Sequence, residues 1–271
     1  MIKKLVLITI TAITLAGLVG CSSKKENKNI VTVGTVSGPE TELMEVAKKV
    51  ALKRYGLDIQ IIPFSDYNGL NPAVVSGSLD ANAFQHKPFL DAQNKARHFT
   101  LVPIGKTFIF PIGIYSHKIK SLAQLKDGDK VAIPNDPTNE SRALLLLQKA
   151  GLIKIKKDAG VNATPDDIIS NPKHLKFIEL DAAQLPRVLP DATLVAINTT
   201  YAKPAGLSPI KDALIHEDAD SPYVNLIVVA KANAKDKKLL ELVKAYQSKP
   251  VIEKAKQLFG DAAIPGWKQS R

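Results

Sequence analysis

The sequence is poor in cysteine, in aromatic residues and in long apolar runs. Cys21 is the only cysteine among the 271 residues, so the chain cannot form an intrachain disulfide. Aromatic residues make up 6% of the chain and do not alternate with a basic stripe, which argues against a surface for single-stranded nucleic acid. After Cys21, no run approaches the about 18 consecutive apolar residues that a transmembrane helix needs. The fold must therefore rest on an apolar core, and the 251 residues after residue 20 suffice for two modest domains or one large one.

The sequence also lacks the motifs on which most enzymes depend. It has no His-Glu-x-x-His, no paired cysteines and no close pair of histidines. Gly105-Lys106-Thr107 resembles the end of a phosphate-binding loop, but Thr100 stands where that loop needs its first glycine. In residues 34–38 the serine comes one place too late for a nucleophile elbow. We therefore expect no enzyme, no catalytic residue, no bound metal and no cofactor.

Residues 1–20 have the pattern of a secretory signal, and Cys21 follows it directly. Lys3 and Lys4 lie at the start of an apolar run that extends to Val19, and Leu-Val-Gly-Cys resembles the processing motif of bacterial lipoproteins. We expect residues 1–20 to be a lipoprotein signal peptide, Cys21 to carry diacylglyceryl lipid and residues 21–29 to be a flexible tether. The protein would then lie in the bacterial cell envelope, anchored to a membrane by its N-terminal lipid and facing outside the cytoplasm, in the periplasm or at the cell surface. The alternative is an ordinary cleaved signal followed by a chance cysteine.

The positive charge of the chain is spread rather than concentrated. The net charge of +11 falls to +9 without Lys3 and Lys4. The surplus lies in three short clusters: Lys24/Lys25/Lys28, Lys154/Lys156/Lys157 and Lys235/Lys237/Lys238. Such clusters could form a nucleic-acid face, or they could serve solubility and attraction to an anionic membrane surface. The scatter favours the second interpretation, so we expect no nucleic-acid partner.

From Ile30 the pattern alternates between strands and helices. A β-rich run at 30–34 is followed by apolar residues at helical spacing over 39–55 and by a second strand at 57–63. Ser37 and Glu40 have the spacing of a capping box at the start of this helix, and Gly56 is expected to end it. The β-α-β order predicts a parallel sheet with right-handed crossovers.

A second β-α alternation begins at residue 130 and indicates a second lobe. Its helix is expected to start at Pro137, with Asp136 as the N-cap, and Pro111 marks an edge or a crossing between lobes. The β run at 223–230 is long enough to return the chain to the first lobe. We therefore expect an α/β protein of two lobes with a ligand cleft between them. The expected divisions are 1–20 signal, 21–29 tether, 30–110 lobe 1, 111–222 lobe 2 and 223–271 lobe 1 again.

Polar residues recur where the predicted strands end, which is where open α/β sheets bind ligands. Four motifs that include these places are similar to those of the methionine-binding lipoprotein family: Asp80–Pro88, Pro134–Asn139, Ile197–Ala202 and Ser221–Leu226. The resemblance to this family, the NlpA-like substrate-binding proteins of methionine ABC importers, extends from about residue 31 to residue 267. It implies a type II periplasmic-binding-protein fold, with methionine as the ligand and an ABC permease with its ATPase as partners.

The resemblance also implies roles for seven side chains. Arg142 is expected to grip the ligand carboxylate through its planar fork, and Asn198 and Asn225 to accept hydrogen bonds from the ligand ammonium. The thioether would lie against Tyr67, Phe84, His86 and Phe89. Simpler interpretations remain for each: a surface ion pair of Arg142 with Glu140 or Asp136, turn chemistry for the asparagines, and core packing for Tyr67, Phe84, His86 and Phe89. Metal ligation is a further alternative for His86, but a lone histidine is usually packed or hydrogen-bonded.

Two departures from the family pattern affect the identity of the ligand more than the fold. Glu140-Ser141 replaces a small apolar pair before the arginine, and Phe89 stands where many relatives have Tyr. We expect free methionine as the ligand, with L-methionine as the isomer. The alternatives are D-methionine, a methionine-containing dipeptide or another apolar amino acid, and more remotely a surface adhesin in which the cleft has no role.

Overall fold

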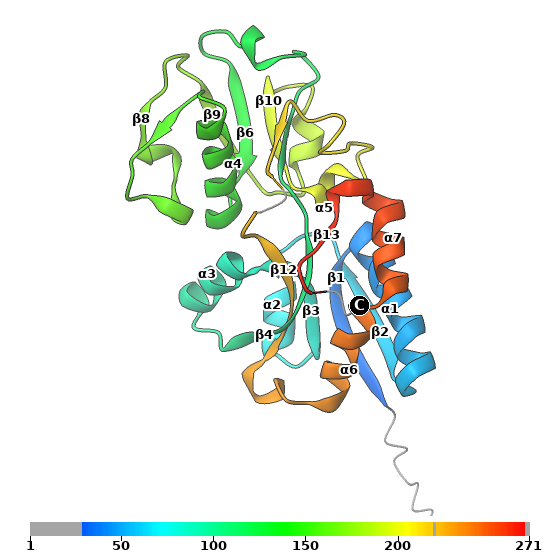
Figure 1. Cartoon of the computed structure of the whole chain (residues 1–271). Helices are drawn as coiled ribbons and strands as arrows, with labels where there is room; N and C mark the ends of the chain where they lie inside the picture. Colours follow the sequence, from blue (N-terminus) through cyan, green and yellow to red (C-terminus); the bar gives the residue numbers. More distant parts are fainter. Residues whose placement is uncertain (1–28, 219–220, 269–271) are drawn as a thin grey trace, which may run out of the picture.

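The computed structural model describes residues 29–218 and 221–268 of the chain. The expected signal peptide, Cys21 and the tether up to residue 28 lie outside the described residues. Figure 1 shows two β-sheets, one above the other, with helices packed around both. The protein is thus of the α/β class, as the alternation of strands and helices predicts.

The lower sheet in Figure 1 has six strands in the order β13-β4-β12-β3-β1-β2. Its strands are β1 (Ile30–Val36), β2 (Asp58–Phe64), β3 (Ala81–His86), β4 (Leu101–Ile109), β12 (Val224–Ala230) and β13 (Ile264–Pro265). β1 is parallel to both β2 and β3, whereas β12 is antiparallel to both β3 and β4. The run at 223–230 therefore does return to the first sheet, as predicted, and it enters between two earlier strands rather than at the edge.

The upper sheet has five strands in the order β11-β5-β10-β6-β9. These are β5 (Gly113–Tyr115), β6 (Lys130–Pro134), β9 (Lys176–Leu180), β10 (Leu194–Ile197) and β11 (Ile215–His216); β7 (Lys154–Ile155) and β8 (Ile168–Ser170) form a separate pair. Pro111 lies between β4 and β5, where the chain passes from one sheet to the other. Because β4 has a neighbour on both sides, the crossing, and not an edge strand, is what accommodates this proline.

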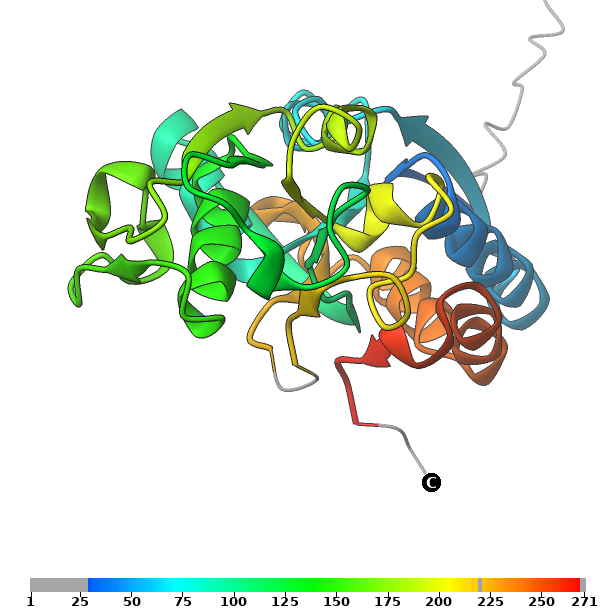
Figure 2. The ribbon, with the colours of Figure 1, turned by 90° about the horizontal axis from the view of Figure 1, so that it is seen from above.

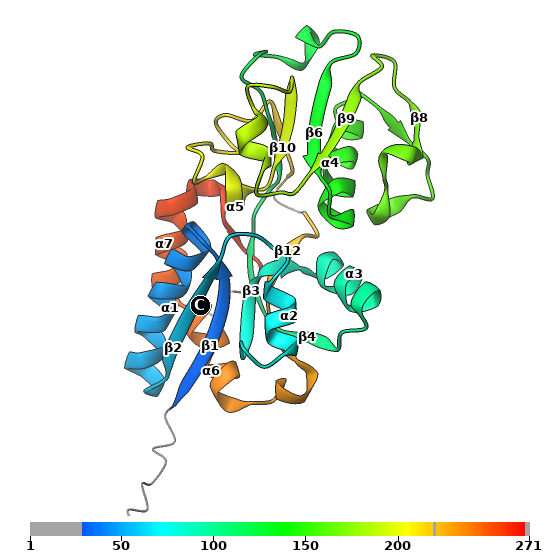
Figure 3. The ribbon, with the colours of Figure 1, turned by 180° about the vertical axis from the view of Figure 1, so that it is seen from behind.

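Seven α-helices cover the sheets in the described part of the chain: α1 (Pro39–Tyr55), α2 (Leu70–Val75), α3 (Lys87–Arg97), α4 (Pro137–Lys149), α5 (Thr199–Ala202), α6 (Lys237–Tyr246) and α7 (Lys249–Phe259). Figure 2, seen from above, shows α1, α6 and α7 gathered on one flank and α3 and α4 on the other. Seen from behind, α1 and α7 lie beside β1 and β2 (Figure 3). α3 belongs to the lower sheet and α4 to the upper one, and the two helices are in contact across the division. None of the helices described is both long and apolar enough to cross a membrane.

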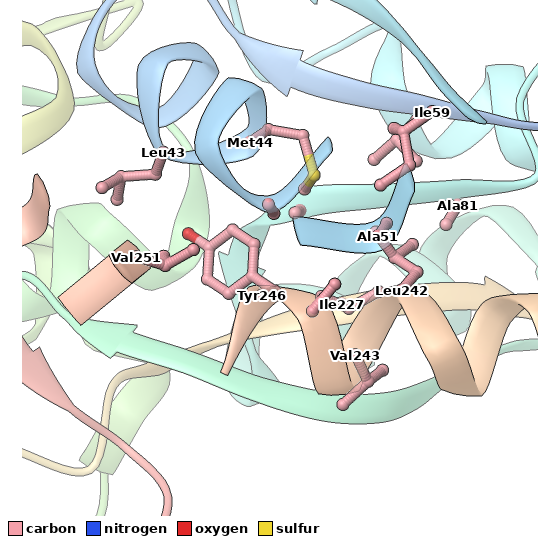
Figure 4. Close-up of a cluster of buried hydrophobic side chains, with 14 of the residues drawn as sticks. Leu43, Met44, Ala51, Ile59, Ala81, Ile227, Leu242, Val243, Tyr246 and Val251 are labelled. Carbon is pink, nitrogen blue, oxygen red and sulfur yellow. The ribbon is translucent and has the colours of Figure 1, made fainter. Parts of the chain in front are cut away.

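The apolar core of the lower sheet lies between that sheet and the flanking helices. Leu43 and Met44 of α1 meet Leu242 and Tyr246 of α6 in one buried cluster (Figure 4). The upper sheet has its own core, in which Leu144 and other apolar residues of α4 pack on its strands. Each sheet thus has a buried apolar cluster of its own, as a packed α/β unit requires, and a further cluster joins residues of both sheets.

The start of α1 differs from its expected form. The N-cap is Gly38 rather than Ser37, and no side chain caps the helix, so the predicted capping box is wrong. Gly38 has φ 107°, a conformation that favours glycine, whereas the helix itself spans Pro39–Tyr55 and ends at Gly56, as predicted. Glu40 is consequently free to turn inward, where it is buried and accepts a hydrogen bond from Thr200 Oγ1 at 2.9 Å.

Candidate ligand-binding pocket

A pocket lies between the two sheets and opens to solvent. Its walls come from β3 and β12 of the lower sheet, from α3, α4 and α5, and from connecting segments: Tyr67, Phe84, Gln85, His86, Phe89, Phe110, Asn139, Arg142, Asn198, Thr199, Thr200 and Asn225. All seven side chains expected to contact a ligand are among them. The structure therefore brings together residues that are up to 158 positions apart in the sequence, from Tyr67 to Asn225.

His86 marks the point where β3 ends and α3 begins. Its Nδ1 accepts a hydrogen bond from the Phe89 backbone N–H at 3.2 Å, so the side chain caps the helix. Its Nε2 lies 3.4 Å from Asn139 Oδ1, which as a carbonyl oxygen can only accept. Burial, followed by the charge of Arg142, holds the pKa of His86 well below its usual value. The imidazole is thus neutral, with its proton on Nε2.

One wall of the pocket consists of aromatic rings. The ring centroids of Tyr67 and Phe84 lie 5.6 Å apart in a stacked arrangement, and Phe89 meets each of them edge-on at 6.0 and 5.6 Å. The ring of Tyr201, on α5, lies 5.0 Å from the ring of Tyr67 but does not line the pocket. The wall offers an apolar, polarisable surface to a ligand side chain.

The edge of the Arg142 guanidinium that carries Nε and Nη2 faces Glu217 rather than the space expected to hold the ligand. Nε donates to Glu217 Oε1 at 2.9 Å and Nη2 donates to Glu217 Oε2 at 2.5 Å. A second N–H of Nη2 donates to the Phe110 carbonyl at 3.2 Å, and one N–H of Nη1 donates to Asn139 Oδ1 at 3.0 Å. Four of the five guanidinium donors are therefore occupied by the protein, which leaves one on Nη1.

The ion pair of Arg142 is buried and has a partner that the sequence did not suggest. The side chain is 3% exposed, and its carboxylate partner is Glu217 rather than Glu140 or Asp136. The guanidinium carbon lies 4.3 Å from the centre of the Tyr223 ring, so a cation–π contact covers one face of the group. Arg142 is thus fixed in position, and a surface ion pair is the wrong description of it.

Asn139 joins the polar side chains of the pocket, although it is not among the site residues predicted from the sequence. Its Oδ1 accepts from Arg142 Nη1 at 3.0 Å and from Asn198 Nδ2 at 2.8 Å, and it faces His86 Nε2. Its Nδ2 donates to both carboxylate oxygens of Asp136, the N-cap of α4. Its position three residues before Arg142 places both side chains on one face of α4, and this spacing is the sequence feature that could have identified it.

Asn198 has a buried oxygen without a partner in the described structure. While its Nδ2 donates to Asn139, its Oδ1 is fully buried and accepts no hydrogen bond. Leaving such an acceptor unsatisfied costs about 1–3 kcal/mol. Asn225 lies nearby on β12, directly opposite His86 in the pairing with β3. The pocket therefore holds an acceptor suited to an N–H group of a ligand.

The departure from the family pattern on α4, the pair Glu140-Ser141, does not reach the pocket. Ser141 donates to the Gly160 carbonyl and accepts from the Ala163 backbone N–H, so its side chain faces residues 160–163. Burial, followed by the charges of Glu179 and other acidic residues, raises the pKa of Glu140 to about 7. Glu140 is buried but does not line the pocket. The replaced pair thus lies behind the binding surface, whereas Phe89 is part of it.

Within residues 29–218 and 221–268, no group of three or more acidic, histidine or cysteine side chains is placed to hold a metal ion. What the pocket does offer is one arginine donor, one unpartnered acceptor and an aromatic wall, enclosed between two α/β sheets. This arrangement defines a two-lobe binding protein for a small polar molecule with an apolar part.

Comparison with known proteins agrees with this class. The chain matches the model of the NlpA lipoprotein family over residues 31–267 and belongs to that family, whose members are binding proteins and not enzymes. It is 52% identical over 252 residues to the D-methionine-binding lipoprotein MetQ of Salmonella typhimurium, which covers 92% of this chain and 93% of that protein.

Two solved structures extend the comparison to the fold. The periplasmic substrate-binding protein of an ABC transporter from Coxiella burnetii is 58% identical, with a TM-score of 0.85, and the match covers 87% of this chain and all of that one. A nutrient-binding protein from Burkholderia cenocepacia, solved with bound methionine, is 51% identical, with a TM-score of 0.86 over 88% of this chain and all of that one. The periplasmic-binding-protein fold expected from the sequence is therefore confirmed.

Proposed function

We propose that this protein is the substrate-binding lipoprotein of a methionine ABC importer. The observation that carries the proposal is the pairing, in one pocket, of a free arginine N–H with the unpartnered Asn198 Oδ1 beside an aromatic wall. The arginine donor suits a carboxylate, the amide oxygen suits an ammonium, and the rings suit an apolar side chain. These are the three parts of an apolar amino acid.

Methionine is the ligand that best fits this set of groups. A thioether gains about 0.3–1.5 kcal/mol from each contact with an aromatic ring, and Tyr67, Phe84 and Phe89 offer three rings. The names of the curated relatives and the ligand of the Burkholderia structure support the same choice. We propose the L-isomer, while the relatives' names make D-methionine the principal alternative.

The proposed partners follow from this role. Lipid on Cys21 and a tether over residues 21–29 would hold the protein at a membrane, outside the cytoplasm, close to the permease and ATPase that it serves. We further propose lobe boundaries at 110/111 and 222/223, so that residues 30–110 and 223–271 move as one body and residues 111–222 as the other. Closure of the lobes over methionine would exclude water and strengthen the contact with Arg142.

Calorimetry on protein that has been unfolded, freed of ligand and refolded tests the assignment. We expect L-methionine to bind with a dissociation constant on the order of micromolar or tighter, near −8 kcal/mol or beyond. D-methionine, leucine and a glycyl-methionine dipeptide, measured in parallel, separate the alternatives. Absence of heat with L-methionine, together with binding of one of the other three, would contradict the proposed ligand.

A further inference from the structure

Arg142 is the only side chain of fixed charge among the residues that line the pocket. Glu217 approaches it from the opposite side, in a groove that also includes Tyr223 and Lys149. The guanidinium therefore separates the ligand space from an acidic residue that the ligand does not touch. A buried arginine without such a partner would favour any ligand with a net negative charge.

Glu217 is held firmly in this position. Its two carboxylate oxygens accept from Nε and Nη2 of Arg142, and Oε2 also accepts from the Ile112 backbone N–H at 3.1 Å. Its own backbone N–H donates to the Ile112 carbonyl at 3.1 Å. The carboxylate is 12% exposed, so solvent screens the pair only weakly. The negative charge of Glu217 thus acts on a ligand in the pocket, although Glu217 does not line the pocket.

We propose that Glu217 is a positioning residue that sets the net charge of the ligand the pocket accepts: paired with Arg142, it selects a zwitterion and rejects an anion. The inference rests on the proposed function, because it concerns the same pocket. A carboxylate without an ammonium would add an uncompensated negative charge near Glu217. An amino acid brings its own ammonium, which the Asn198 Oδ1 accepts, and so keeps the site neutral.

The decisive measurement compares two ligands that differ only in the ammonium group. Methionine and 4-(methylthio)butanoate are titrated into wild-type protein, and the ratio of their dissociation constants measures the discrimination against the anion. In Glu217→Gln, which keeps the shape and one acceptor oxygen, we expect this ratio to fall by about tenfold or more, because Arg142 then presents an uncompensated charge. A purely structural role would weaken both ligands alike and leave the ratio unchanged, which would overturn the proposal.

Asp218→Asn is the matched control. It removes the same charge one residue away, from an exposed side chain that is paired with Lys149, and it should leave the ratio as in the wild type. Glu217→Asp keeps the charge on a shorter side chain. It should weaken methionine binding while preserving the ratio, and it tests the proposal even if Glu217→Gln fails to fold, because a tenfold change in its ratio would contradict the role of charge.

If the proposed function is wrong, the titrations give a result that differs from the one that would contradict the role of Glu217. If wild-type protein bound no methionine compound, the ligand assignment would be wrong, and the role of Glu217 would be judged on a second pair, norleucine and hexanoate, with the same expected change. Equal affinity of the wild type for the zwitterion and the anion of a pair would overturn the inference about Glu217 while leaving the binding of the amino acid intact.

Discussion

At the scale of single residues, Asn139 connects the groups that we expect to hold the two ends of a ligand. Its Oδ1 meets donors from Arg142, Asn198 and His86, each of which lines the pocket. A change at this position should therefore disturb the carboxylate side and the ammonium side together. The spacing from Arg142 indicates a shared helix face, but the full role depends on side chains from three different elements and cannot be predicted from local sequence.

We expect Asn139→Ala to lower methionine affinity by about a hundredfold or more, because three donors lose their common acceptor and each loss costs about 1 kcal/mol. Isothermal titration of the variant and the wild type measures the change. Asn171→Ala is the control: Asn171 bridges the backbone of Leu175 within a turn, so it should lower the melting temperature but leave affinity unchanged. Equal affinities for Asn139→Ala and the wild type would show that Asn139 does not organise the site.

At the scale of elements, α4 shows how far the sequence predicts the site. Pro137 at its start and the N-cap Asp136 both follow from local pattern, and the structure confirms both of them. The partner of Arg142 does not follow, because Glu217 lies 75 positions away on a segment without regular structure. Local signals predict where a helix begins and which face is buried, whereas contacts between distant segments depend on the packing of the two sheets.

The strands show the same contrast between features that local sequence predicts and features that depend on packing. The run at 223–230 is recognisable as β by composition, and its return to the first sheet was predicted from its length. Its insertion between β3 and β4 was not, since strand order depends on which edges remain available as the sheet assembles. The ends of most elements differ from prediction by one to a few residues, as expected from propensity alone.

The buried leucines of α4 permit a test of the upper core. Leu144 is fully buried, and Leu144→Ala should lower the free energy of unfolding by about 2–5 kcal/mol through lost burial and the cavity that remains. The neighbouring Leu145 is only partly buried, so Leu145→Ala should cost clearly less. Urea denaturation of both variants measures the difference. Equal losses would indicate that α4 packs with another face on its sheet.

At the scale of the whole molecule, Glu40 links the two sheets. It lies in the first turn of α1, and Thr200 of α5, whose hydroxyl donates to it, belongs to the pocket wall. Burial is the main cause that raises the pKa of Glu40 from 4.5 to about 8, while the hydrogen bond from Thr200 opposes the shift. The negative charge that Glu40 carries when ionised contributes to the raised pKa values of three neighbouring tyrosines, Tyr67, Tyr201 and Tyr246. At neutral pH, Glu40 is therefore protonated in the folded protein.

This protonation gives stability a definite pH dependence. Between pH 4.5 and about 8 the unfolded chain has lost the proton of Glu40 and the folded protein keeps it, so stability falls as pH rises through this window. Glu40→Gln should remove that slope and be more stable than the wild type at pH 8, with little difference near pH 4. Thermal unfolding at several pH values measures it. The control, Glu42→Gln, changes an exposed carboxylate of the same helix that pairs with Lys254, and it should retain the wild-type slope.

The two crossings between the sheets run side by side, bound to each other where Glu217 meets Ile112 and where Val224 pairs with Ile109. Two adjacent crossing segments can act as a hinge between the lobes, and the hinge axis then runs along their length. If the lobes swing about that axis, Arg142 lies at almost zero radius, because Glu217 and the Phe110 carbonyl attach it to the hinge itself. The carboxylate of an incoming amino acid would then meet a group that moves little while the lobes close around the ligand.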